Sequence, residues 1–411
     1  MKSWDAIIVG AGIIGLSLAI ELNKRGLKLL IVEKGEPGRE ASWAAGGMLA
    51  DDGLEVAPAL QELASASARM YPEFVHELED ESRMKIDLRD TGAIVFVEQE
   101  KVEHEKVEQE KPDCNDDATG KNSGNLHRLP QPLRELEPAI DVSGRRPELT
   151  PLFLQERSVD PRHLTAAAIA AAKHRGIDFS SGDEVLAIET ADGKATGVRT
   201  SKTQFASGLV INCAGAWAGK IGEPRSGPRS GPQSGPRSGP RLGDAANPAH
   251  VEPIIPTRPV KGQMLSVAMP RKEMVRHVIR TPNVYLIPRS DGRLVIGATQ
   301  EEAGFDKKTV PETIQRLHQA ALEVAPKLED ARILEAWAGL RPGTPDALPI
   351  MGGTSTRGYF VATGHFRDGI LLSPATARVM GQVVAGEKPD FDLTAFAVER
   401  FESRITASTP L

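Results

Sequence analysis

A glycine-rich turn near the N-terminus is the feature that most restricts how this chain can fold. Residues 5–9 form a short apolar run rich in isoleucine, and Gly10-Ala11-Gly12-Ile13-Ile14-Gly15 follows it directly. Residues 16–24 then have the apolar spacing of a helix. Residues 28–32 show the pattern of a second buried strand, which is followed by the acid Glu33. This order predicts a β-α-β unit.

The residues of this unit favour a dinucleotide site at the turn. Glycines at positions 10, 12 and 15 allow a tight turn, close approach of the backbone to a pyrophosphate and close packing of the helix. The N-terminal N–H groups of that helix attract the anion. Glu33, about twenty residues beyond the glycines, is placed to accept hydrogen bonds from a ribose. The alternative is a glycine turn with a structural role alone.

The rest of the chain favours FAD over NAD. A nicotinamide domain would continue with regular α/β repeats, whereas this chain leaves the pattern after one unit and returns to it twice. The second return ends in a glycine-rich turn at residues 364–369, which precedes a long helical segment at 370–385. Residues 41–49 are small and uncharged, and we expect them to form a second close-approach loop rather than a helix.

Length and pattern together predict two intertwined domains, because 411 residues are about twice the size of a common domain. The expected fold class is α/β plus α+β, with a Rossmann-like FAD-binding domain interlaced with a mainly antiparallel-sheet substrate domain. We assign residues 1–52, 158–222 and 336–411 to the first domain, 53–157 and 248–335 to the second, and 223–247 to a low-complexity disordered insertion. Residues 98–125 are expected to form another exposed insertion.

Charge and cysteine content exclude several classes of protein. The chain carries 50 Lys and Arg against 56 Asp and Glu, a formal net charge of -6, so no overall basic field attracts a nucleic acid. The uncharged run at residues 6–20 is flanked by acids and is shorter than the ~20 residues of a spanning helix, so we expect a cytoplasmic protein without membrane attachment. With Cys114 and Cys213 as its cysteines, neither a disulfide framework nor a metal site is expected.

Several short motifs then occur along the chain in a specific order. They are residues 10–15 with Glu33, Ala45-Gly46-Gly47-Met48-Leu49, Val260-Lys261-Gly262-Gln263, Tyr285-Leu286-Ile287-Pro288-Arg289, Gly297-Ala298-Thr299, Trp337-Ala338-Gly339-Leu340-Arg341-Pro342 and Gly364-His365-Phe366-Arg367-Asp368-Gly369-Ile370-Leu371-Leu372. In this order the motifs resemble the FAD-dependent D-amino-acid oxidase superfamily, and within it the glycine oxidases of thiamine biosynthesis. The resemblance covers most of the chain outside the two insertions.

The resemblance implies oxidation of glycine or another small amine or amino acid. In that family hydride passes from the α-carbon to FAD and then to O2, which gives H2O2 and an imine. The imine hydrolyses to an oxo acid and ammonia or is used for the thiamine thiazole, so a thiazole synthase is a candidate partner, and a homo-oligomer is expected. FAD should be non-covalent, because related sarcosine oxidases attach their flavin through a late cysteine and none follows Cys213.

The resemblance also assigns substrate-binding residues. Arg341 would grip the substrate carboxylate, and Tyr285 would donate its hydroxyl to the same group. The planar fork of arginine matches a carboxylate in a two-pronged geometry. Arg367 would lie near the substrate entrance and the flavin, and Gln300 would line the substrate site. Without the resemblance, Arg341 would be interpreted as an ordinary salt-bridge residue and Tyr285 as a core tyrosine.

The glycine turn and the resemblance together assign the cofactor contacts. They are Gly10, Ala11, Gly12, Ile14, Gly15, Glu33, Ala45, Gly46, Gly47, Met48, Val185, Ala214, Gly215, Trp217, Gly364, His365, Arg367, Asp368, Gly369 and Ile370. Asp368 and Gly369 would open the last helix, whose N–H groups can face a flavin carbonyl. His365 lies in a turn and is interpreted as structural. No side chain is a clear general base, which is consistent with hydride transfer from an unprotonated amine.

Other functions stay open. One alternative is a D-amino-acid or sarcosine oxidase or dehydrogenase that uses another electron acceptor, because such an enzyme fits much of the same pattern. A membrane quinone is disfavoured as that acceptor, since the sequence shows no spanning segment and no basic amphipathic segment. A non-catalytic alternative is a flavin-bound scaffold whose insertions engage a partner protein. Glycine, sarcosine and small D-amino acids are all candidate substrates.

Overall fold

The computed structural model describes residues 3–51, 56–98, 126–142, 149–222 and 255–401. Apart from Glu98, both predicted insertions lie outside the described residues, as does Cys114. No helix among the described residues has both the length and the apolar character needed to cross a membrane.

Within the described residues, six strands form the sheet that carries the glycine turn. Their order is β19-β20-β13-β1-β2-β9, and neighbours are parallel except for β19 and β20. The strands are β1 Ala6–Val9, β2 Leu29–Glu33, β9 Asp178–Ser181, β13 Val210–Asn212, β19 Ile350–Gly353 and β20 Tyr359–Thr363. Helix α1 (Ile13–Lys24) connects β1 to β2, so the predicted β-α-β unit is confirmed.

Alternating apolar side chains bury both faces of this sheet. Ile8 and Ile31 pack against helices, whereas Ile7 and Leu30 face a separate core on the other side. The helices are α1, α3 (Gln61–Ser82), α6 (Pro161–His174) and α8 (Ser373–Val384). A small antiparallel sheet of β10 Val185–Ala191, β11 Lys194–Thr200 and β12 Gln204–Ala206 covers the other face. Burial on both sides explains why β1 and β2 are almost entirely apolar.

A second sheet of eight strands in the described residues has the order β18-β14-β17-β16-β15-β5-β7-β6 and is antiparallel except between β15 and β5. Its strands are β5 Ala93–Glu98, β6 Leu126–Arg128, β7 Leu149–Leu154, β14 Arg258–Ala268, β15 Val278–Arg280, β16 Tyr285–Pro288, β17 Arg293–Gly297 and β18 Arg332–Gly343. It is the mainly antiparallel sheet that the sequence predicts, and β16 and β17 form an antiparallel hairpin within it.

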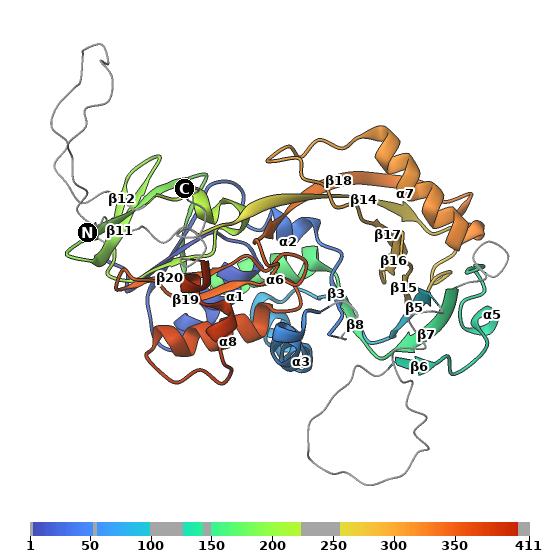
Figure 1. Ribbon diagram of the computed structural model, residues 1–411, viewed down its shortest axis with the longest axis horizontal. Coiled ribbons are helices and arrows are strands. Elements are labelled where there is room, and N and C mark those ends of the chain that lie inside the picture. Colours follow the sequence, from blue (N-terminus) through green and yellow to red (C-terminus); the bar gives the residue numbers. More distant parts are fainter. Residues whose placement is uncertain (1–2, 52–55, 99–125, 143–148, 223–254, 402–411) are drawn as a thin grey trace, which may run out of the picture.

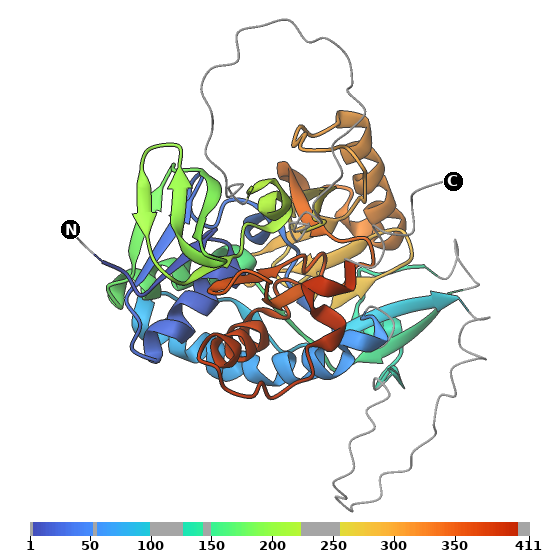
Figure 2. The same cartoon turned by 60° about the vertical axis from the view of Figure 1, so that its left-hand side comes forward.

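The two sheets form two lobes that lie side by side. Figure 1 shows β19, β20, α1 and α8 in one lobe and β14 to β18 in the other, and Figure 2 shows the same division from another side. Helix α7 (Pro311–Val324) covers one face of the larger sheet, with Leu317 packed near Leu286 in the core. The opposite face, which carries Met264 and Tyr285, meets the N-terminal segment through Ala44.

Short elements complete the two lobes. They are α2 Ala41–Ala44, β3 Met48–Leu49, β4 Leu88–Arg89, α5 Leu133–Leu136, β8 Arg157–Val159 and the 3-10 turns η1 Pro58–Leu60, η2 Gly215–Lys220, η3 Pro326–Leu328, η4 Thr394–Phe396 and η5 Val398–Phe401. Strands β3, β8 and β4 pair in that order into a small sheet beside the glycines of residues 46–47.

Three boundaries differ from those predicted. Residues 41–44 form α2 rather than a loop, because the N–H of Ala44 bonds to the carbonyl of Glu40 at 3.2 Å and closes a helical turn. The last helix begins at Ser373 rather than at residue 370, with Pro374 in its first turn, and residues 369–372 form turns instead. Residues 336–343 belong to β18 of the larger sheet, so the predicted domain boundary at 336 falls inside a strand.

Candidate active site

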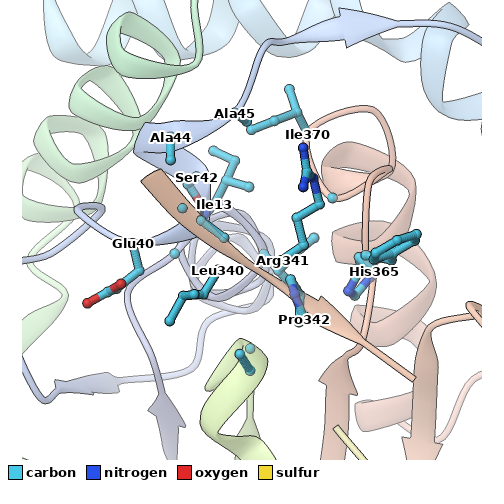
Figure 3. A pocket seen from close by; sticks show the side chains of 18 of the residues that line it. Ile13, Glu40, Ser42, Ala44, Ala45, Leu340, Arg341, Pro342, His365 and Ile370 are labelled. Carbon is cyan, nitrogen blue, oxygen red and sulfur yellow. Dashed lines mark hydrogen bonds between the residues drawn. The ribbon is translucent and has the colours of Figure 1, made fainter. Parts of the chain in front are cut away.

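A cavity of about 480 Å³ lies between the two sheets. Its walls come from the ends of β1, β2 and β13, from the loops that follow them, and from the face of the larger sheet that carries Tyr285. The carboxyl ends of parallel strands are the usual ligand site in an open α/β sheet. Figure 3 shows side chains from distant parts of the chain around this cavity: Ile13 and Ser42, Arg341 of β18, and His365.

The glycine turn has a backbone geometry that excludes other residues. Gly10 has a φ of +103°, and a Cβ at this position would lie 2.6 Å from the carbonyl oxygen of Cys213. A Cβ on Gly15 would lie 2.1 Å from the carbonyl oxygen of Gly10. Glycine therefore lets β1, β13 and the first turn of α1 pack together. Because Gly12 and Ile13 line the cavity, the positive end of the α1 dipole is available to an anion there.

Glu33 is held beside this turn by backbone donors. Its side chain lines the cavity, and the residue is 8 % exposed. Its Oε2 accepts the N–H of Ala11 at 2.8 Å, and its Oε1 accepts the N–H of Gly35 at 2.9 Å. An ionised carboxylate has about four lone-pair positions, so the same oxygens can also accept hydrogen bonds from ribose hydroxyls.

Ser42 is a site residue that the sequence analysis missed. Its Oγ accepts the N–H of Ile13 at 2.9 Å and so satisfies one of the donors that a helix N-terminus leaves open. A Cβ on Gly12 would lie 3.3 Å from the same oxygen, which explains the tight fit between the turn and α2. A hydroxyl within the small, uncharged segment 41–49 was the signal that could have identified it.

Most of the predicted cofactor residues line this one cavity. They are Gly10, Gly12, Ile14, Glu33, Ala45, Gly46, Gly47, Met48, Val185, Ala214, Gly215, Trp217, Gly364, His365, Arg367, Asp368, Gly369 and Ile370. Ala11 and Gly15 are not among its lining residues. Ala11 instead donates its N–H to Glu33, and Gly15 packs against the turn itself.

Trp217 stands at the part of the cavity next to Glu33. The Nζ of Lys34 lies 3.1 Å from the centroid of the indole ring, and the ring of Phe305 packs against it at 5.1 Å. Burial lowers the pKa of Lys34 from its ordinary value. This wall is therefore aromatic and cationic, although Lys34 and Phe305 carried no recognisable signal in the sequence.

The side chain of Arg341 lies in a space on the larger sheet that is free because Gly262 has no side chain. It lies on β18, and its guanidinium extends over Gly262 of β14, where a Cβ would come within 2.2 Å of Nη1. Nη1 donates to the carbonyl oxygen of Thr299 at 3.0 Å, which fixes the orientation of the group. Arg341 lines the cavity, as the sequence analysis expected.

Tyr285 reaches the same face of the sheet in a similar way. Its ring lies over Gly297 of β17, where a Cβ would come within 2.8 Å of the hydroxyl oxygen. The hydroxyl is 3.8 Å from Sδ of Met264, which is two positions from Gly262 on β14. Residues two positions apart on a strand project from the same face. The phenol of Tyr285, near Met264, and the guanidinium of Arg341, over Gly262, therefore lie next to each other on this face of the sheet.

The other two predicted substrate residues differ in position. Arg367 lines the cavity, and its side chain is exposed. Gln300 is exposed and is not among the lining residues. Because β17 ends at Gly297, strand alternation no longer sets the direction of residue 300. The neighbouring Thr299 accepts the N–H of Gln263 with its Oγ1 at 2.8 Å, and Ala298 lines the cavity. The structure does not bring Gln300 to the cavity.

A buried ion pair beside Tyr285 was also missed. Arg280 of β15 lies opposite Tyr285 in the sheet, is 4 % exposed and lines the cavity. Its Nη2 donates to Oε2 of Glu156 at 2.9 Å. Removing one partner of a buried pair costs about 3–5 kcal/mol because the other charge is left buried and unpaired, so neither side chain of this wall can be replaced alone without destabilising the protein. The signal in the sequence that could have identified this pair was an arginine directly after the apolar residues Val278 and Ile279.

His365 lines the cavity but is bonded into the protein. The residue is 2 % exposed, and its Nε2 lies 3.1 Å from Oγ1 of Thr376 on α8. Burial lowers the pKa of His365 to about 3. The ring therefore stays neutral near neutral pH, and its bond to α8 agrees with the structural interpretation from the sequence.

Replacing His365 with glutamine is expected to flatten the pH dependence of stability between about pH 6.5 and pH 4. The unfolded chain protonates this histidine below its ordinary pKa of about 6.5, whereas the folded protein keeps it neutral down to about pH 3. The unfolded state thus binds more protons as the pH falls, and this group lowers the free energy of unfolding by up to about 1.4 kcal/mol per pH unit. Urea unfolding of both proteins across this range measures the slopes, and equal slopes would contradict the assignment.

Comparison with known proteins shows the class to which this site belongs. Residues 5–383 match the sequence model of the DAO family, described as FAD dependent oxidoreductase. The chain therefore belongs to this family of FAD-dependent oxidoreductases.

Individual relatives share more than the family pattern. The chain is 30% identical to glycine oxidase of Pseudomonas aeruginosa, over 95% of this chain and 97% of the relative. It is also 30% identical to the bifunctional protein ThiO/ThiG of Trichormus variabilis, but spans only 56% of that longer protein. The crystal structure of glycine oxidase from Geobacillus kaustophilus matches with a TM-score of 0.80 and 27% identity, covering 97% of this chain and 99% of that one. The expectation of an FAD-dependent amino-acid oxidoreductase is confirmed.

The residues of the cavity fit FAD. A Cβ on Gly10 or Gly47 would collide with backbone oxygen at 2.6 Å or 2.0 Å, so only glycine fits at these two places, and both line the cavity. The turn at Gly10 and the start of α1 suit the pyrophosphate, and Glu33 suits a ribose. Cys213 lines the cavity with its thiol buried, which raises its pKa and makes it a poor nucleophile.

Proposed function

We propose that this protein oxidises glycine or another small amino acid or amine to its imine, with O2 as the electron acceptor and H2O2 as a product. The imine would then hydrolyse to an oxo acid and ammonia. Similarity to glycine oxidases over nearly the whole chain supports this substrate class. The substrate would be bound through its carboxylate by Arg341 and Tyr285.

The observation that carries the proposal is the convergence of these two side chains. Arg341 lies over Gly262 and Tyr285 over Gly297, and both line the cavity that also contains the glycine turn. A guanidinium and a phenol on one sheet face provide charge-assisted and neutral donors for a single carboxylate. Desolvation between the two lobes strengthens such a pair because water no longer competes.

The chain's own residues would bind and orient the substrate. When bound, FAD supplies the redox chemistry by accepting hydride from the substrate α-carbon. Arg341, fixed by its bond to Thr299, would hold the carboxylate at one end and leave the amine and α-carbon directed into the cavity. His365 is bonded to Thr376, and burial lowers its pKa to about 3, so it is too weak a base to take the amine proton. The substrate amine would instead lose this proton to solvent before it enters the cavity.

The biological setting is part of the same proposal. The relative from Trichormus variabilis is a bifunctional ThiO/ThiG protein, and this supports a role in supplying thiamine thiazole synthesis, with a thiazole synthase as partner. Cytoplasmic location, non-covalent FAD and a homo-oligomeric state remain predictions from the sequence.

A substrate panel tests the proposal. The yellow protein is mixed without oxygen with glycine, sarcosine, D-alanine and D-proline in turn, and loss of flavin absorbance is followed. It is then mixed with air, and O2 consumed is compared with H2O2 formed. We expect reduction by glycine or sarcosine and equal amounts of O2 and H2O2. Rapid reduction by an amino acid with slow reoxidation by O2 but fast reoxidation by a quinone would instead identify the dehydrogenase alternative.

A further inference from the structure

Arg289 is a buried cation that does not line the cavity. It directly follows β16, and its side chain is 2 % exposed. Its Nη1 donates to the carbonyl oxygen of Val159 at 2.9 Å, and its Nη2 donates to the carbonyl oxygen of Gly46. Its Nε lies 3.8 Å from Oδ2 of Asp160. One guanidinium from the larger sheet therefore joins β8, the start of α6 and the loop that contains Gly46.

Asp160 compensates the charge of this arginine. Its Oδ1 accepts the N–H of Arg162 at 2.9 Å and caps α6, and its Oδ2 accepts a bond from Nη2 of Arg293 at 2.7 Å. Burial alone would raise the pKa of Asp160, but its electrostatic interactions, the largest of them with Arg289, hold this pKa below its ordinary value. Because a carboxylate offsets the buried charge, the Nη groups of Arg289 can bind neutral backbone carbonyls.

The bond to the Gly46 carbonyl sets the orientation of the peptide between residues 46 and 47. Gly46 and Gly47 line the cavity but Arg289 does not, so this carbonyl points away from the cavity. In a trans peptide the N–H lies opposite the C=O. The N–H of Gly47 therefore points toward the cavity.

Neighbouring contacts keep this peptide in place. The carbonyl of Gly47 accepts the N–H of Val159 at 2.8 Å, which holds the following peptide. A Cβ on Gly46 would lie 2.8 Å from Cδ1 of Ile287 and 3.5 Å from the ring of Tyr285. The loop is thus pressed against the hairpin at the substrate end of the cavity, where the redox-active ring of the cofactor must meet the substrate.

We propose that Arg289 is a positioning residue that presents the N–H of Gly47 as a hydrogen-bond donor to the flavin ring. A fixed donor aimed at a ring that gains electron density on reduction stabilises the reduced form. Arg289 acts through the peptide and never touches the cofactor. The proposal depends on FAD binding, which belongs to the family, and is independent of which amine is the substrate.

Sulfite binding tests this role, because sulfite adds to oxidised flavin and its affinity reports how well the protein stabilises electron density on the ring. Arg289→Lys keeps the charge opposite Asp160 but cannot bridge two carbonyls with one fork. Arg293→Lys is the matched control, since Arg293 also binds Asp160 but has no bond to the carbonyl of Gly46 or Val159. In the FAD-loaded proteins we expect the sulfite Kd to rise about tenfold for Arg289→Lys and to stay within about twofold for Arg293→Lys.

Two results would overturn the proposal: a wild-type sulfite Kd and visible spectrum in Arg289→Lys, or equal changes in both variants. If Arg289→Lys does not retain FAD, the melting temperature of its apoprotein decides. An unchanged melting temperature supports the proposal, because the folded protein has then lost only the presentation of the loop. If the melting temperature falls enough to explain the loss of FAD, Arg289 has a purely structural role and the proposal is rejected.

Discussion

Replacing Arg341 with lysine is expected to lower kcat/KM for glycine by about 100- to 1,000-fold while leaving FAD bound. The guanidinium lies over Gly262 in the cavity, and its bond to Thr299 fixes the fork toward the substrate. Lysine presents a single charge and cannot form two parallel bonds to a carboxylate, and charge-assisted bonds contribute about 1.5–3 kcal/mol each. Steady-state peroxide assays and anaerobic flavin reduction measure the loss.

Two comparisons make this result specific. Arg258→Lys is a matched control, because Arg258 is exposed, pairs with Glu302 at 3.2 Å and lies outside the cavity lining. It is expected to change kcat/KM by less than about twofold. A simple amine without a carboxylate should be oxidised equally slowly by wild type and Arg341→Lys. Wild-type efficiency of Arg341→Lys on every amino acid would show that another group binds the carboxylate.

Replacing Gly262 with alanine is expected to reduce kcat/KM by about 100-fold, although the new methyl group never contacts the substrate. A Cβ here would lie 2.2 Å from Nη1 and 2.5 Å from Nη2 of Arg341, so the guanidinium must move. The colliding atoms are the end of a flexible side chain, and the protein should therefore fold with a stability change of less than about 1 kcal/mol. Displacement of a binding group by about 1 Å is enough to cost a factor of about 100.

The control for this variant is Gly208→Ala, because nothing lies within 4 Å of a Cβ at Gly208. The double variant with Arg341→Lys is the sharper test. If Gly262→Ala acts only by moving the guanidinium, the two losses should not add, and the double variant should resemble Arg341→Lys alone. Full additivity, or loss of FAD from Gly262→Ala, would mean that Gly262 serves another purpose.

The substrate face of the larger sheet thus depends on small residues as much as on charged ones. Gly262 and Gly297 lie beneath Arg341 and Tyr285, and a Cβ on Gly339 would lie 2.4 Å from Cβ of Ala44. These glycines belong to neighbouring strands, and none of them has a positive φ. Their absent side chains create the space in which the two lobes meet.

Some of this structure could be predicted because it is encoded locally. The β-α-β unit follows from apolar spacing and glycine positions within residues 5–33. The capping of α6 by Asp160 was likewise predictable from an aspartate before proline. Arg341 and Tyr285 were identified by resemblance to a family, since a lone arginine or tyrosine in a strand carries no such signal.

Other features depend on contacts that sequence spacing does not define. Gln300 was expected at the substrate site, but β17 ends at Gly297, and Ala298 rather than Gln300 lines the cavity. Ser42 and the pair of Arg280 with Glu156 were missed because their partners lie far away in the chain.

By itself, the amino-acid sequence determined the glycine turn and the two kinds of sheet, because backbone conformation and apolar periodicity are properties of neighbouring residues. The class of chemistry was implied by the resemblance of the ordered motifs to a family. Only the tertiary structure decided which side chains share the cavity and how they are held. Strand register brought Arg341 over Gly262, and burial made His365 neutral. Packing of the larger sheet against the loop at residues 46–47 brought the guanidinium of Arg289 to the carbonyl of Gly46. Residues that are hundreds of positions apart in the chain come into contact only when the two sheets pack together.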